Sequence, residues 1–465
     1  MKEHYHLVGI GGIGMGALAS LLLAKGYKVS GSDIKSNELV ENLRQSGADI
    51  KIGHSSVNVN GADVVVYSSA IPFENPELQA AKMSGIVLMQ RASLLAQLMR
   101  EHIGITVAGA HGKTTTTSLV SHILVEARLH PTTAVGGLIL GSSNNARLGA
   151  GKYFVAEVDE SDRSFLQFSP QYSIITNIDF EHVDQYKDWD DILSAYGQFI
   201  NGTAKDGMVI ACGEDDRLSA LCKKAGRPYK TYGFSSSFDI WAEEIRHYGF
   251  STSFDCIVHG NDLGQIITEL PGRHNILNAL AATGMALTIG IDFKVIQKAL
   301  KSFPGVKRRF QIKEDSKNIL VVDDYGHHPT EIRAALATAQ QIKPRRLITV
   351  FQPHRYSRWK ALMEEFAQAL IDTDYLIVTD VYAASEQPIE AVNAEKFVEL
   401  MKSITDKPVL YLKKDGIVAH LANMIGPGDL VLTLGAGDIT HISDELSKLI
   451  RLNKICQTLE ERSSL

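Results

Sequence analysis

Short apolar runs alternate with longer stretches of helical spacing along most of this chain. The run HYHLVGI (4–10) stops at glycines, residues 15–27 carry apolar side chains at helical spacing, and KVSGSD (28–33) is predicted as the next strand. Runs of this length predict strands, and a spacing of three to four residues predicts helices. Further strands are predicted at 62–69, 104–110, 152–160, 172–179, 207–213, 318–326, 345–353, 374–382 and 429–437, and further helices at 93–101, 114–127, 275–290 and 331–343. This alternation predicts an α/β fold whose parallel sheets are covered by helices on both faces.

The order of the elements divides the chain into three α/β domains. Two glycine-rich loops each begin a strand–loop–helix unit, which predicts two separate sheets with a boundary near 101–103. Residues 238–270 contain strands without helices, as in a small antiparallel insertion, and SFPGVKRRF (302–310) ends a helical pattern like a hinge. We therefore predict a Rossmann-like domain at 1–102, a central P-loop ATPase-type domain at 103–305 and a C-terminal Rossmann-like α/β domain at 306–465.

Composition supports this division and excludes several classes of protein. A length of 465 residues fits about three domains. The net charge of −6 argues against nucleic-acid binding, and the four cysteines have no CxxC spacing, which favours reduced thiols. No signal peptide and no apolar run of about 18 residues stand out, so we expect a cytoplasmic protein without membrane insertion.

The first glycine-rich loop has the spacing of a phosphate-binding fingerprint. Gly9, Gly11 and Gly14 follow one predicted strand, and Asp33 ends the next. Glycines let the backbone approach a diphosphate, which the N-terminus of the following helix attracts. From these residues alone, NAD or FAD, another nucleotide diphosphate, or tight packing without a ligand all remain open.

The second loop is a shortened P-loop. Gly112, Lys113 and Thr114 match the usual pattern, but Val107 stands where its first glycine belongs, and the nearest upstream glycine is Gly109. Lysine would neutralise transferring phosphate oxygens and threonine would bind Mg²⁺, although an ordinary strand-to-helix turn is the simpler alternative. A hydride-transfer enzyme needs no ATP loop, so the two loops together predict an enzyme that uses ATP to join a nucleotide-linked group to another molecule.

Seven motifs identify the family that this chain resembles. In order they are GAHGKTTTTS, AEVDESDRSFL, NIDFEHVDQY, GRHNILNA, GVKRRF, DDYGHHPTEI and FQPHRYSR. Together they resemble the Mur ligase family, especially members that add L-alanine to UDP-N-acetylmuramate in peptidoglycan precursor synthesis. The shortened P-loop is normal in that family, although Ala110 stands where its pattern has threonine.

The resemblance implies a reaction with two steps and three small-molecule substrates. ATP phosphorylates the lactyl carboxylate of UDP-N-acetylmuramate, and the amine of L-alanine attacks the acyl phosphate. Mg²⁺ is the implied cofactor, no nucleic-acid partner is expected, and the protein is expected to be a monomer or homodimer. Three alternatives remain: a related ligase that attaches a recycled murein peptide to the same sugar, a scaffold that has lost catalysis, and an NAD-dependent oxidoreductase.

The same resemblance assigns roles to individual residues. For UDP-sugar binding these are Gly9, Gly11, Gly12, Gly14 and Asp33, and for ATP binding Gly109, Ala110, His111, Gly112, Lys113, Thr114, Thr115, His274, Asn275, Asn278 and Arg309. Metal binding falls to Thr114, Glu160 and His182, with Glu157 as a second choice, and catalysis to Lys113, His182 and His327. The amino acid would be bound by Tyr325, His327, His354, Arg355 and Arg358, because arginine grips a carboxylate with paired hydrogen bonds and histidine can take a proton from an amine.

Overall fold

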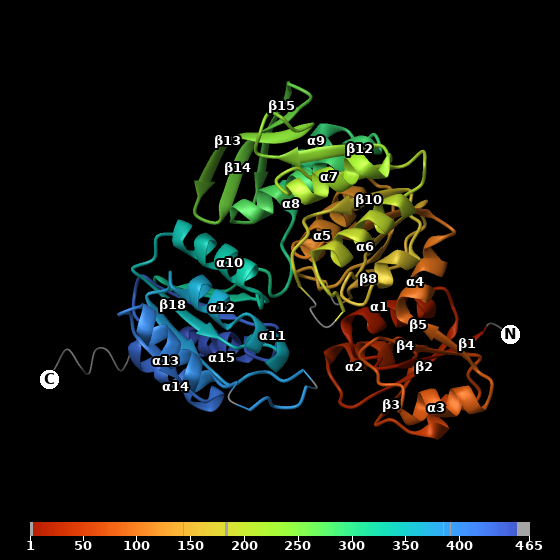
Figure 1. The fold of residues 1–465 in the computed structure, drawn as a ribbon, viewed down its shortest axis with the longest axis horizontal. Helices are drawn as coiled ribbons and strands as arrows, with labels where there is room; N and C mark the ends of the chain where they lie inside the picture. Colours follow the sequence, from red (N-terminus) through yellow and green to blue (C-terminus); the bar gives the residue numbers. More distant parts are fainter. Residues whose placement is uncertain (1–2, 143, 182–184, 385, 391, 453–465) are drawn as a thin grey trace. The chain divides into compact units, whose positions relative to one another are not determined.

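The computed structural model describes residues 3–142, 144–181, 185–384, 386–390 and 392–452 (Figure 1). The chain divides into two compact units near Val306. The second unit also takes in the short segments 247–252 and 270–274. Three sheets with intervening helices confirm the predicted α/β fold. The boundaries of the three predicted domains stay a prediction.

The first sheet has five parallel strands in the order β3-β2-β1-β4-β5. Its elements are β1 (His4–Val8), α1 (Ile13–Ala24), β2 (Lys28–Asp33), α2 (Glu38–Gln45), β3 (Asp49–Ile52), η1 (Ser56–Val59), β4 (Val64–Tyr67), α3 (Pro76–Met83), β5 (Val87–Gln90) and α4 (Arg91–Met99). The strand order reverses between β1 and β4, and ligands of open α/β sheets bind beyond the carboxyl ends of the strands at such a point. The loop after β1 is the first glycine-rich loop.

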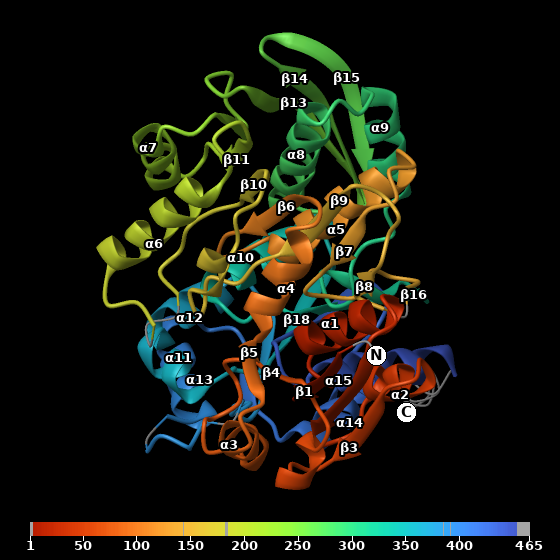
Figure 2. The ribbon, with the colours of Figure 1, turned by 90° about the vertical axis from the view of Figure 1, so that its right-hand side faces the viewer.

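The central sheet has ten strands in the order β15-β14-β13-β12-β11-β10-β6-β9-β7-β8. Its strands are β6 (Ile103–Ala108), β7 (Thr132–Ala134), β8 (Ala146–Arg147), β9 (Tyr153–Glu157), β10 (Tyr172–Ile175), β11 (Met208–Cys212), β12 (Tyr229–Gly233), β13 (Ile240–Tyr248), β14 (Ser251–Val258) and β15 (Asn261–Thr268). The helical segments are α5 (Lys113–Glu126), η2 (Ser164–Gln167), α6 (Trp189–Gly202), α7 (Asp216–Ala225), α8 (Arg273–Thr288) and α9 (Phe293–Ser302). Helix α5 packs against β6 and β9 directly after the P-loop (Figure 2).

The strands predicted between residues 238 and 270 are present, and they extend the central sheet. Two-residue turns join β13 to β14 and β14 to β15, and turns this short connect antiparallel strands. Strand β13 pairs in parallel with β12, so the hairpins continue the sheet at its end, and α9 packs on β15 (Figure 1). The helical pattern ends at Ser302, and Gly305 has a φ of +95°, which fits the predicted break at the Pro304–Gly305 pair.

The third sheet has six strands in the order β16-β17-β21-β18-β19-β20. Its elements are β16 (Gln311–Ser316), β17 (Ile319–Asp324), α10 (Pro329–Gln341), β18 (Arg346–Phe351), α11 (Tyr356–Ala361), α12 (Met363–Leu370), β19 (Tyr375–Val378), α13 (Ala394–Ile404), β20 (Val409–Tyr411), α14 (Lys414–Met424), β21 (Asp429–Leu434) and α15 (Thr440–Arg451). Strand β16 runs antiparallel at the edge, and the other pairings are parallel.

Alternate residues of β17 enter two different cores. Leu320 and Val322 join the core that contains α10, α12 and α13, whereas Ile319 and Val321 join the core that contains α14 and α15. A strand whose successive side chains are both buried reads as a continuous apolar run, which is how this strand could be predicted.

Among the residues that the structure describes, no helix has the length and apolar character needed to cross a bilayer.

Candidate functional site

The first glycine-rich loop is braced by the residue that ends β2. The Gly11 N–H donates to the Asp33 carboxylate over 2.9 Å, and the Asn37 side-chain amide donates to the Gly11 carbonyl over 3.0 Å. A β-carbon on Gly11 would lie 2.9 Å from both the Asp33 carboxylate and Val40 Cγ2, so a larger residue would force these side chains to move. Gly12 caps α1 and Gly14 lies in its first turn, so the predicted residues gather at one helix N-terminus, where an anion is favoured.

The P-loop is held by Thr176 and Asn177, which follow β10. The His111 N–H donates to Asn177 Oδ1 over 2.9 Å, and the Ala110 N–H donates to the Asn177 carbonyl over 3.2 Å. Asn177 Nδ2 and Thr176 Oγ1 donate to the His111 carbonyl over 3.0 and 2.5 Å. The amides of Ala110 and His111 therefore donate within the protein. The first N–H groups of α5 have no helical carbonyl to donate to, so they are able to donate to an anion.

Gly112 sits where the loop turns into α5, and two predicted asparagines lie behind it. Its φ is +83°, and a β-carbon here would lie 2.6 Å from Asn278 Oδ1. That oxygen also accepts a hydrogen bond of 3.1 Å from the Thr116 hydroxyl, and Asn278 Nδ2 donates 3.0 Å to Asn275. The structure thus places Asn275 and Asn278 next to the P-loop.

The Lys113 ammonium is paired with Glu160. Lys113 Nζ lies 2.8 and 2.9 Å from the two Glu160 oxygens, and it also donates to the carbonyls of Gly109 and Ala110. Burial disfavours the ammonium, but the charges of Glu160 and Asp159 outweigh it and hold the pKa of Lys113 above its ordinary value. Lys113 is therefore a fixed cation at the N-terminus of α5.

Oxygen ligands suited to Mg²⁺ surround the start of α5. The Thr114 hydroxyl donates to Glu157 Oε1 over 3.0 Å, and Glu157 Oε2 accepts the Gly136 N–H over 2.8 Å. With the nearby Glu160 carboxylate, these residues offer the hydroxyl and carboxylate oxygens that Mg²⁺ prefers. His182, the other predicted metal ligand, lies outside the described residues.

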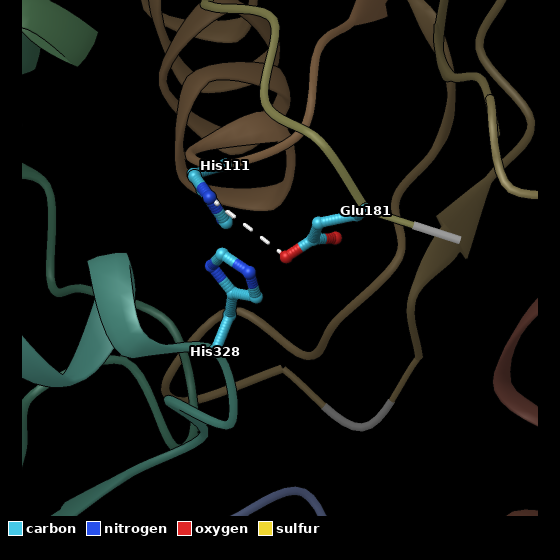
Figure 3. Close-up of side chains that lie close together, drawn as sticks. All are labelled: His111, Glu181 and His328. Carbon is cyan, nitrogen blue, oxygen red and sulfur yellow. Dashed lines mark ion pairs between the residues drawn. The ribbon is translucent and has the colours of Figure 1, made fainter. Parts of the chain in front are cut away.

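The side chain of His111 is directed at two acidic residues beyond β10. Its Nε2 lies 2.9 Å from the Asp179 carboxylate and 3.8 Å from Glu181, the ion pair drawn in Figure 3. Glu181 is buried and His111 is half-buried. His328, also labelled in Figure 3, belongs to the second unit and caps α10 there. The backbone of His111 therefore belongs to the P-loop, and its imidazole is engaged by carboxylates.

In the second unit, the segment after β17 presents Tyr325 and His327. His327 Nδ1 lies 3.1 Å from the Tyr325 carbonyl and 3.2 Å from Glu331 Oε2. Both neighbours are acceptors, so they favour the tautomer with the proton on Nδ1 and leave Nε2 as the basic nitrogen. The guanidinium of Arg309 lies 5.1 Å from the Tyr325 ring centroid and 3.8 Å from Glu331.

His354 joins this group from the end of β18. Its ring lies 5.5 Å from that of His327 and stacks at 5.7 Å on Tyr382. Burial and the nearby His327 and Arg358 lower the pKa of His354 to about 3, and the neutral ring accepts a hydrogen bond of 3.3 Å from Arg358. Arg355 has a φ of +67° at the start of α11, and its Nε is buried without a hydrogen-bond partner among the described residues.

His274 lies at the start of α8, in the segment that belongs to the second unit. Burial, with the charge of Arg309, lowers the pKa of His274 to about 4. Thr115 lies buried in the first turn of α5, next to the metal-binding candidates.

Sequence reasoning missed four residues that shape these sites. Asn177 and Thr176 follow β10 directly, so the expectation that ligand sites gather at the carboxyl ends of parallel strands applied to them as well. Glu331 orients His327, and its signal was its position one helical turn after that histidine. Tyr382 had no signal, because only the pairing of β18 with β19 brings it to His354.

Three family models match the chain in succession. The model described as "Mur ligase family, catalytic domain" matches residues 4–103, "Mur ligase middle domain" matches 107–286, and "Mur ligase, glutamate ligase domain" matches 308–437. A UDP-N-acetylmuramate–L-alanine ligase of Geotalea uraniireducens (strain Rf4) is 47% identical over 97% of this chain and 98% of its own. The enzyme of the same name from Syntrophobacter fumaroxidans (strain DSM 10017 / MPOB) is 46% identical over 96% and 95%.

Two solved structures match nearly the whole chain. UDP-N-acetylmuramate–alanine ligase from Thermotoga maritima has 32% identity and a TM-score of 0.83, covering 97% of this chain and 99% of its own. A murein peptide ligase from Psychrobacter arcticus 273-4 has 25% identity and a TM-score of 0.72, with 96% and 98% covered. The chain belongs to the Mur ligase family.

Proposed function

We propose that this protein is an ATP-dependent ligase that adds L-alanine to UDP-N-acetylmuramate in peptidoglycan precursor synthesis, with release of ADP and phosphate. The observation that carries the proposal is the 47% identity over 97% of the chain to a relative of that name. The first sheet would bind the UDP-sugar, the central sheet ATP, and the third sheet the amino acid. We expect the reaction to take place in the cytoplasm, where ATP is available.

The first step is phosphorylation of the lactyl carboxylate. A carboxylate and a triphosphate repel each other, so cations must lie between them. Lys113 supplies a buried positive charge, and its pairing with Glu160 keeps it aimed at the loop until a phosphate takes over. Gly112 and the first residues of α5 supply backbone N–H donors for the terminal phosphate.

We also propose Mg²⁺ as the cofactor, bound through Thr114, Glu160 and His182, with Glu157 as a further ligand. Bound there, Mg²⁺ would neutralise phosphate charge as a Lewis acid. The Thr114–Glu157 hydrogen bond places a hydroxyl and a carboxylate at one point beside the P-loop, which supports this assignment.

The second step is attack of the alanine amine on the acyl phosphate. The amine must lose a proton, and we assign its removal to His327, whose Nδ1 is held by the Tyr325 carbonyl and Glu331. His354 does not share this role, because burial and its cationic neighbours lower its pKa to about 3, so it stays neutral and is a weak base. Arg355 and Arg358 would grip the carboxylate of the amino acid.

The test is phosphate release by the purified full-length protein with ATP, Mg²⁺ and UDP-N-acetylmuramate, with L-alanine in one reaction and a murein tripeptide in another. We expect release with L-alanine, and no release with it would refute the proposal. Release with the tripeptide alone would establish the second candidate, a murein peptide ligase, which the likeness to the Psychrobacter arcticus protein keeps open.

A further inference from the structure

Arg91 stands out because it is a cation at the first position of a helix. Helix α4 begins at Arg91, where the positive end of the helix dipole disfavours another positive charge. Nearby side chains hold this helix start in place. Ser93 donates to Gln167 over 2.6 Å, and Gln167 donates to Gln90 over 2.9 Å, so α4 is tied to η2 on both sides of Arg91.

The guanidinium of Arg91 lies against the first glycine-rich loop. A β-carbon on Gly14 would lie 2.9 Å from Arg91 Nη1, 3.2 Å from its Cδ and 3.4 Å from its Cζ. The arginine therefore crosses the first turn of α1 at Gly14, where the helix has no side chain to block it. Gly14, the third glycine of the fingerprint, therefore leaves room for the Arg91 side chain.

The other end of the guanidinium faces the acidic segment after β9. Arg91 Nη2 lies 4.0 Å from Asp159 Oδ2, at the limit of an ion pair. The side chains of Arg91 and Asp159 are 22% and 42% exposed, so an exposed pair this long does little to hold the arginine. Asp159 precedes Glu160, the partner of Lys113, so Arg91 lies between the first glycine-rich loop and the acidic segment that pairs with the P-loop lysine.

We propose that Arg91 binds the diphosphate of the nucleotide sugar and positions the sugar for phosphorylation. This inference rests on the proposed function, because it needs the UDP-sugar at the first glycine-rich loop. A planar guanidinium can form two parallel hydrogen bonds to phosphate oxygens, and the N-terminus of α1 attracts the same group. The weak pair with Asp159 is then the resting position of a side chain whose ligand is the phosphate.

The experiment compares the full-length wild type with Arg91→Ala, Arg91→Lys and a matched control, Arg100→Ala. Arg100 is the exposed C-cap residue of the same helix. Calorimetry would measure the affinities for UDP-N-acetylmuramate, UDP and ATP. We expect Arg91→Ala to weaken both uridine ligands by about 10- to 100-fold and to leave ATP affinity unchanged. Arg91→Lys should fall between these values, and Arg100→Ala should match the wild type.

The outcomes distinguish failure of the role of Arg91 from failure of the proposed function. Unchanged affinity of Arg91→Ala for UDP, or an equal loss of ATP affinity, would overturn the role of Arg91 and leave the proposed function intact. Failure of the wild type to bind UDP or UDP-N-acetylmuramate would overturn the proposed function itself. Retained ATP binding shows that a variant is folded. If Arg91→Ala does not fold, the affinities of Arg91→Lys for UDP, UDP-N-acetylmuramate and ATP test the role of Arg91 instead.

Discussion

Replacing Lys113 by methionine separates the catalytic role that we propose for this residue from its contribution to stability. Methionine has a similar length and carries no charge. The variant loses four hydrogen-bond contacts of the ammonium and deprives the Glu160 carboxylate of its cation. Breaking a fully buried ion pair from one side costs about 3–5 kcal/mol. The side chains here are 16% and 5% exposed, so the expected loss is roughly 2–4 kcal/mol.

Catalysis should fall much further than stability. Loss of a charge that stabilises the transferring phosphoryl group costs at least about 100-fold in kcat. Affinity for UDP-N-acetylmuramate should stay at the wild-type value, because the first glycine-rich loop belongs to another sheet. Phosphate release measures kcat, and calorimetry measures the affinity for UDP-N-acetylmuramate. In a domain of about 200 residues each kcal/mol lowers the unfolding temperature by about 2–4 °C, so the expected drop is about 4–16 °C.

A double-mutant cycle with Glu160→Gln tests the reasoning. The double variant removes both charges, so it should recover stability relative to Lys113→Met while remaining inactive. A coupling below about 0.5 kcal/mol between the two substitutions would refute the claim that this pair stabilises the loop. Loss of UDP-sugar binding in Lys113→Met would contradict the independence of the two loops.

Three further predictions concern the same sites. Gly112→Ala should weaken ATP binding and cost at least about 1 kcal/mol in a denaturation experiment, because the backbone φ of +83° is strained for any side chain; wild-type affinity would contradict this. The pKa of His274 is about 4 in the folded protein and near 6.5 in the unfolded chain. Between these pH values the unfolded state binds one more proton, so stability falls as pH falls. His274→Gln should therefore reduce the drop in the urea midpoint between pH 7 and pH 5, and an unchanged drop would exclude this histidine as its source. Thr114→Val should raise the Mg²⁺ concentration needed for half-maximal phosphate release by removing the hydroxyl that now donates to Glu157, whereas Thr117→Val, one turn along the same helix, should not; equal shifts would argue against Thr114 as a ligand.

Local patterns made much of the fold predictable. The run that became β17 ends at polar residues, and its apolar content reflects burial on both faces. The strand-rich segment at 238–270 was equally visible. That it continues the central sheet was not, because pairing with β12 depends on partners distant in the sequence.

The candidate site was predictable where the functional residues lie together in one short sequence motif. Lys113 and Gly112 lie in such a motif, and so do the histidines after β17. Tyr382 and Asn177 act through contacts with other strand ends, so their roles appear only once the sheets are formed. Arg91 was invisible for the same reason, since its contact with Gly14 joins two helices that are distant in the sequence.

The hydrogen bonds from Asn177 to the P-loop have a consequence for how the loop tolerates change. Because these bonds hold the loop from a neighbouring strand, the loop is already ordered in the folded protein. Nucleotide binding therefore costs little conformational entropy. Ala110 takes part through its amide, which donates to the Asn177 carbonyl. A position engaged only through its backbone can exchange its side chain freely, which explains how alanine serves where the family pattern has threonine.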